Sequence, residues 1–184
     1  MLTSGDIPPV NNRQVTGRPT AHASRRGLLS RSDLRGSIVH ASQSLAEISG
    51  FSRSELIGQP HNILRHPDVP DTLFHLMWQE LEATREFFGV IKDRCRNGDH
   101  YWVKTRVAPV MLRGRAIGYT SARYLIPPAN ARPWEELFSD MRHAESAFDA
   151  TDPARFTPAG RVLHDFVRRH GFDDLGSLAL SFNP

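Results

Sequence analysis

The order in which strand-like and helix-like patterns follow one another is the strongest constraint on the fold of this chain. Asn97-Gly98 is a strong signal for a tight hairpin between two strands. Five short runs are rich in β-branched or aromatic residues or are bounded by turn residues, namely 28–32, 37–40, 87–91, 100–111 and 116–126. Within residues 28–126, helical patterns occur only between the second and third of these runs. This segregation predicts an α+β fold with a five-stranded antiparallel sheet and short helices on one face.

Two short helices are expected directly after the first two strands. Leu45 and Ile48 lie three residues apart and are followed by Gly50, which suits a helix end. Ser52 and Glu55 then have the spacing of a capping box, which opens a second helix.

A loop over residues 59–70 leads into the clearest helix of the chain. Asp68 or Asp71 is positioned to cap the start of this helix. Its apolar residues recur at helical spacing and are Leu73, Phe74, Met77 and Leu81.

The two ends of the chain differ from this central part. Residues 1–26 are rich in polar residues and proline, which predicts a mobile arm. After Pro127-Pro128, an apolar stripe from Trp134 to Phe148 predicts an amphipathic helix, and 162–167 predicts a shorter one. We therefore expect an arm, a domain over 27–126 and a helical C-terminal extension over 127–184.

Composition narrows the function classes. No apolar run approaches the roughly 20 residues that span a bilayer, and the N-terminus lacks the apolar core of a secretory signal, so a cytoplasmic location is expected. Cys95 is the sole cysteine, which excludes an internal disulfide or a cysteine-rich metal site. The net charge of +3 comes with dispersed arginines rather than a basic run, so nucleic-acid binding is not expected.

Three segments carry a resemblance to a known family. The segment 48–58 reads ISGFSRSELIG and resembles the general PAS consensus. The segment 59–70 reads QPHNILRHPDVP, and 96–103 reads RNGDHYWV, followed by Ala108-Pro109-Val110 and Gly118-Tyr119. These last segments look like the PAS domains of bacterial aerotaxis receptors. The resemblance implies a PAS fold, a sensory role in redox or oxygen signalling, and a pocket that holds FAD.

The chemistry of several matching residues suits such a pocket. Arg65 offers a charge-assisted fork to a phosphate or a ring carbonyl, and Asn62 and His66 offer hydrogen bonds. His66 also suits bracing of the loop, and Asp68 suits a helix cap as well as a cofactor contact. Trp102 suits core packing or stacking, and only one of Trp102 and its neighbour Tyr101 can face the pocket.

Three positions differ from the flavin-binding relatives. Ser42 stands where the resemblance implies asparagine, Phe87 where it implies tryptophan, and Asp93 where asparagine is usual. An ionised Asp93 only accepts hydrogen bonds and adds negative charge. Ser42 and Phe87 complete the candidate cofactor-binding set of Asn62, Arg65, His66, Asp68, Ser42, Phe87 and Trp102. The alternatives are FAD bound differently, another ligand, or an empty pocket.

The expected function is therefore signalling rather than catalysis, because the sequence has no Ser-His-Asp order with flanking motifs and no glycine-rich phosphate loop. The signal is expected to pass by protein contact, in a homodimer or to a separate chemoreceptor or kinase. One alternative is a cofactor-free dimerisation or docking module. Another is a haem sensor that uses one of His61, His66 and His75 as an axial ligand.

Overall fold

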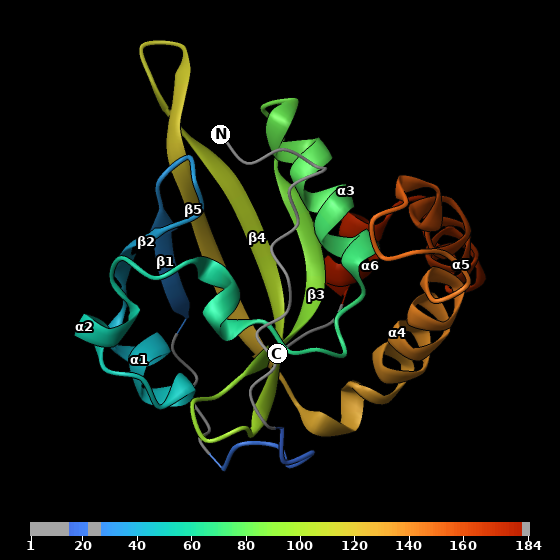
Figure 1. The fold of residues 1–184 in the computed structure, drawn as a ribbon, viewed down its shortest axis with the longest axis horizontal. Coiled ribbons are helices and arrows are strands. Elements are labelled where there is room, and N and C mark those ends of the chain that lie inside the picture. Colours follow the sequence, from blue (N-terminus) through green and yellow to red (C-terminus); the bar gives the residue numbers. More distant parts are fainter. Residues whose placement is uncertain (1–14, 22–26, 182–184) are drawn as a thin grey trace.

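The computed structural model describes residues 15–21 and 27–181 and contains a five-stranded antiparallel sheet (Figure 1). The strand order is β2-β1-β5-β4-β3, which places β3 at one edge. The strands are β1 Leu28–Ser32, β2 Ile38–Ala41, β3 Phe87–Arg94, β4 His100–Leu112 and β5 Arg115–Ile126. The predicted α+β class, with its five strands in this order along the chain, is confirmed.

The connection between β2 and β3 carries the short helices. They are α1 Gln43–Ser49, α2 Arg53–Leu56, the 3₁₀ helix η1 His61–Leu64, and α3 Asp71–Glu82. Gly50 ends α1 in the left-handed region, with a φ of 71°. Ser52 and Glu55 form both halves of the predicted capping box. The η1 turn was not predicted and lies in the segment expected to be a loop.

The predicted cap of α3 is wrong. The N-cap residue is Pro70, which makes no side-chain hydrogen bond to the helix. Neither Asp68 nor Asp71 caps it, because Asp68 pairs with Lys92 at 2.7 Å and Asp71 lies inside the first turn. The acceptor comes instead from Glu145, far away in the sequence, which receives the backbone N–H groups of Asp71 and Thr72.

The C-terminal extension is helical, as predicted, and it lies beside the edge strand β3 (Figure 1). It comprises η2 Pro128–Asn130, α4 Arg132–Glu145, η3 Pro153–Arg155, α5 Phe156–Arg169 and α6 Leu175–Ser181. The helix α5 is longer than expected, and α6 was not predicted. Phe148, the last residue of the predicted stripe, lies beyond α4 and is 39% exposed.

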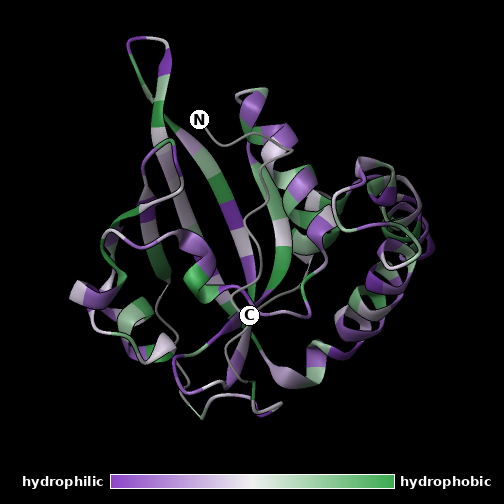
Figure 2. Ribbon diagram, viewed as in Figure 1, coloured by the Kyte–Doolittle hydropathy of each residue, from purple (hydrophilic) through white to green (hydrophobic). Residues whose placement is uncertain are grey.

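The extension shares one hydrophobic core with the sheet. Trp134, Phe138 and Met141 of α4 belong to the same buried cluster as the apolar residues of β3 and β4. The ring of Phe138 lies 5.3 Å from that of Trp102 in β4. Figure 2 shows a largely hydrophobic β3, beside which the adjacent helix α3 has both hydrophobic and hydrophilic turns. In the described part of the chain, no helix is both long and apolar enough to cross a membrane.

Part of the segment expected to be a mobile arm runs beside the start of β4. His100 donates its backbone N–H to Arg18 at 3.0 Å and accepts one from Thr20 at 2.8 Å. Strand-like pairing therefore holds residues 15–21, because β4 has unpaired backbone groups at this point. The rest of the predicted arm, 1–14 and 22–26, lies outside the described residues.

Candidate functional site

A cavity of about 320 Å³ lies between α3, η1 and the face of the sheet that these helices cover. This volume is at the lower end of the range typical of sites for small organic ligands. Its apolar walls come from α3 and from two strands, and consist of Phe74, Met77, Trp78, Leu81, Ile91 and Val107. The walls therefore suit a flat apolar ring system.

Strand alternation decides which side chains reach the cavity. Ile91 and Asp93 of β3, and Ser121 and Arg123 of β5, line it at every second position. The residues between them face the opposite side of the sheet.

Arg123 organises the polar end of the cavity. Its guanidinium donates to the Ser30 hydroxyl at 3.1 Å and to His61 Nε2 at 3.0 Å. The Ser30 hydroxyl also lies 2.8 Å from the same His61 nitrogen. A guanidinium has no acceptor, so His61 Nε2 accepts and the ring is neutral with its proton on Nδ1. Burial, reinforced by the charge of Arg123, lowers the pKa of His61 to about 3.

Asp93 lies beside Arg123 in the same polar end. Burial raises the pKa of Asp93 to about 6, although Arg123 and Tyr101 act in the opposite direction. Within the described residues, neither Asp93 Oδ2 nor Arg123 Nε makes a hydrogen bond, and both atoms are buried. Buried polar atoms of this kind ordinarily have a partner. These two atoms face each other at 3.6 Å as an ion pair, so the polar end of the cavity is built on a buried pair of opposite charges.

Two of the seven predicted cofactor-binding residues line the cavity, namely Asn62 and Arg65. The Arg65 guanidinium lies 4.2 Å above the Phe74 ring, donates to the Val69 carbonyl at 3.0 Å and pairs with Asp71.

Three other predicted residues do not line the cavity, namely His66, Asp68 and Trp102. Arg65 forms an isolated antiparallel bridge with Asp93, so its neighbour His66 points away from the cavity. His66 Nδ1 accepts the backbone N–H of Asp68 at 3.1 Å. Burial, together with the charge of Lys92, lowers the pKa of His66 to about 4. Trp102 faces the same side and packs on α4, and Tyr101 does not line the cavity either.

The last two predicted residues have local contacts. The Ser42 hydroxyl caps α1 by accepting from Leu45 N at 3.2 Å, and it also accepts from Leu29 N at 3.0 Å. Phe87 is 3% exposed at the start of β3 and does not line the cavity.

The sequence reasoning did not single out Ser30 or Arg123 as site residues. The signal that could have found them is alternation, because polar residues at 121 and 123 occupy the inward positions of a strand. Of the three histidines considered as haem ligands, His61 lines the cavity. His66 faces away, and His75 stacks on Phe156 at 4.2 Å.

Comparison with known proteins agrees with this architecture. The aerotaxis receptor of Escherichia coli (strain K12) is 41% identical over 109 residues, which are 59% of this chain and 22% of the receptor. The nitrogen fixation regulatory protein of Klebsiella pneumoniae is 26% identical over 83 residues, 45% of this chain and 17% of that protein. The chain thus spans only about a fifth of the length of these relatives.

Solved structures show the same fold. A PAS domain from Colwellia psychrerythraea superposes with a TM-score of 0.51 at 21% identity, covering 54% of this chain and 86% of that domain. A light-oxygen-voltage domain gives a TM-score of 0.53 at 20% identity, covering 60% of this chain and 83% of its own.

The PAS fold profile matches residues 22–121, which is more than half of the chain. Together with the five-stranded sheet, the helices that cover one of its faces and the relationship to the aerotaxis receptor, this match shows that the chain belongs to the PAS fold family.

Proposed function

We propose that the cavity binds the ring system of a flavin, FAD, and that the protein senses redox state or oxygen through it. The observation that carries the proposal is the cavity itself, whose apolar walls lead to a polar end that holds the ion pair of Asp93 and Arg123. The 41% identity with an aerotaxis receptor supports the same ligand class and the same kind of signal.

The residues of the cavity fit such a ring. Phe74 and Trp78 offer apolar and aromatic surface, and Asn62, Arg65 and Arg123 offer donors for ring carbonyls. Asp93 accepts a ring N–H when it is ionised and donates when it is protonated. A bound flavin supplies a redox change that alters charge and protonation in the site. These polar side chains would respond through their hydrogen bonds.

Cofactor content is the direct test. The full chain is purified, its absorbance spectrum is recorded, and any ligand released on denaturation is identified by mass spectrometry. Protein that lacks ligand is then titrated with FAD, FMN and haem. Flavin absorbance and released FAD would support the proposal. A colourless chain that takes up no flavin on titration would refute it, and a Soret band would favour haem.

A matched pair of arginine variants tests the site. Arg123→Gln removes the charged donor at the polar end, and a hydrogen bond to a charged group contributes about 1.5–3 kcal/mol, so FAD affinity should fall at least about tenfold. Arg106→Gln, in β4, changes an exposed arginine that pairs with Glu86, and should leave the affinity unchanged. Equal affinities for the two variants would place the flavin elsewhere.

The output is proposed to be protein contact, in a homodimer or with a separate chemoreceptor or kinase. Sedimentation of the oxidised and reduced protein over a range of concentrations would detect the first case. Pull-down of a purified candidate receptor or kinase in both redox states would detect the second.

A further inference from the structure

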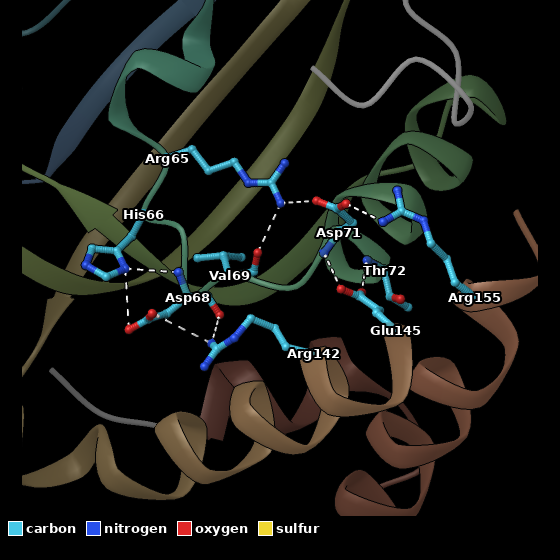
Figure 3. Close-up of polar contacts among 9 residues, drawn as sticks. All are labelled: Arg65, His66, Asp68, Val69, Asp71, Thr72, Arg142, Glu145 and Arg155. Atoms are coloured by element: carbon cyan, nitrogen blue, oxygen red, sulfur yellow. Dashed lines mark hydrogen bonds and ion pairs between the residues drawn. The ribbon is translucent and has the colours of Figure 1, made fainter. Parts of the chain in front are cut away.

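The loop that follows η1 separates the cavity from the C-terminal helices. Figure 3 shows Arg65 at one end of this loop, Asp71 at the other, and side chains of α4 and of η3 reaching in from the opposite side. The loop is therefore in contact with the cavity through Arg65 and with the C-terminal helices through its other end.

Asp71 joins an arginine of the cavity to an arginine of the extension. One of its oxygens pairs with the Arg65 guanidinium, and the other accepts from Arg155 Nη1 at 2.6 Å. Burial favours a raised pKa for Asp71, but the two guanidinium groups hold it below its ordinary value. Asp71 is thus ionised at neutral pH and fixes the direction of the Arg65 side chain, together with the Val69 carbonyl.

Glu145 attaches the last turn of α4 to the first turn of α3. Its Oε1 accepts from Thr72 N at 2.7 Å, and its Oε2 accepts from Asp71 N at 3.2 Å. A carboxylate at a helix N-terminus satisfies free N–H groups and is favoured by the helix dipole. Arg142, one turn earlier in α4, donates to the Asp68 carbonyl. The extension therefore holds the loop at Asp68, at Asp71 and at the start of α3 (Figure 3).

We infer that Glu145 and Arg155 are positioning residues for the cavity, and that ligand binding and docking of the C-terminal helices favour each other. Docked helices fix Asp71, and Asp71 holds Arg65 in the direction in which it lines the cavity. A ligand that contacts Arg65 in this direction binds more tightly when the C-terminal helices are docked. By thermodynamic linkage, the bound ligand must raise the equilibrium constant for docking by the same factor. The flavin form of this inference rests on the proposed function, whereas the coupling of loop and helices does not.

Ligand affinity tests the first half of the inference. Glu145→Ala and Arg155→Gln are expected to weaken FAD binding by about fivefold or more, which is the lower range of measured couplings between sites. Glu145→Gln keeps one acceptor oxygen and should fall between Glu145→Ala and the wild type. Arg132→Gln is the control, because this α4 residue is 84% exposed and pairs only with Glu136 in the described structure. Circular dichroism checks that each variant is folded. Unchanged FAD affinity in folded Glu145→Ala and Arg155→Gln would overturn the inference.

Hydrogen exchange tests the second half with and without ligand. In ligand-free protein, Arg65→Gln should speed exchange of the α4 amides and of the first turn of α3, whereas Arg106→Gln should not. In the wild type, saturation with FAD should slow exchange of the same amides. If the wild type takes up no FAD, the proposed function fails, and the ligand-free comparison still decides the coupling. Equal α4 exchange in Arg65→Gln and Arg106→Gln would overturn it.

Discussion

Asp93 in β3 and Arg123 in β5 meet inside the cavity, with 3.6 Å between Asp93 Oδ2 and Arg123 Nε and only 6% of each side chain exposed. The separation is too long for a hydrogen bond, so the charge of Arg123 only partly offsets the burial of the carboxylate. Burial therefore dominates, and it raises the pKa of Asp93 to about 6 from an ordinary value of 3.8.

This shift makes the stability of the protein depend on pH in a defined direction. The folded state holds the Asp93 proton more tightly than the unfolded state between pH 3.8 and about 6, so this group lowers stability as pH rises through that window. Asp93→Asn removes the titration. The free energy of unfolding of the variant minus that of the wild type should therefore be larger at pH 7 than at pH 4, by on the order of 1–3 kcal/mol.

Urea unfolding of both proteins at pH 4 and pH 7 measures this difference. Asp140→Asn is the control, since Asp140 is exposed on α4. A difference between Asp93→Asn and wild type that is the same at both pH values would contradict the assignment.

His61 is expected to remain neutral over the physiological range. Its folded pKa of about 3 lies below the ordinary value of 6.5, because the ring is buried beside Arg123. The unfolded chain binds the proton first, so the stability that this group contributes is lost as pH falls from about 6.5 towards 3. Nuclear magnetic resonance of the imidazole signals, assigned with His61→Gln, should show no titration of His61 between pH 5 and 8. A midpoint near 6.5 would mean that the ring is exposed or unpaired.

The elements that could be predicted from the sequence are those with local causes. The Asn97-Gly98 turn and the Ser52–Glu55 capping box depend on residues within a few positions of one another, and both are present. The start of α3 has a distant cause instead. Its cap is Glu145, which lies 74 residues from Asp71, and no local pattern indicates that pairing. The packing of the C-terminal extension on the core of the sheet has the same kind of distant cause.

The site shows the same division. Asn62 and Arg65 were found through motif and chemistry, and both line the cavity. His66 and Trp102 were chosen by the same reasoning, yet the bridge of Arg65 to β3 and the alternation of β4 turn them to the other side of the sheet. Which face a residue takes depends on register, and register is set by pairing with distant strands.

The capping box of α2 offers a local stability test. Ser52→Ala removes the acceptor for Glu55 N at 3.2 Å, and loss of such a cap costs about 1 kcal/mol of unfolding free energy. Ser139→Ala is the control, because Ser139 is an exposed serine inside α4 and far from any helix cap. Chemical denaturation measures both. An equal loss in the two variants would show that the cap contributes nothing beyond a surface hydroxyl.

A pair of glycine variants tests the close contact between β5 and the end of β1. A Cβ on Gly118 in β5 would lie 2.3 Å from the Ser32 backbone oxygen, where the chain leaves β1. That oxygen belongs to the backbone, so it cannot rotate away, and Gly118→Ala must shift β1 relative to β5. Such overpacking costs about 1–3 kcal/mol of unfolding free energy.

Gly160→Ala is the matched control for this substitution. Gly160 is inside α5, and beyond the neighbouring backbone of that helix no atom of the described residues lies within 4 Å of a Cβ placed on it. Replacing a helix glycine by alanine should raise the unfolding free energy by about 0.5–1 kcal/mol. The two changes add the same methyl group, so opposite signs in urea unfolding separate the clash from the general effect of alanine. If Gly118→Ala were as stable as the wild type, β1 could not lie this close to β5. The position of Ser30 in the wall of the cavity would then be wrong as well, because Ser30 belongs to β1.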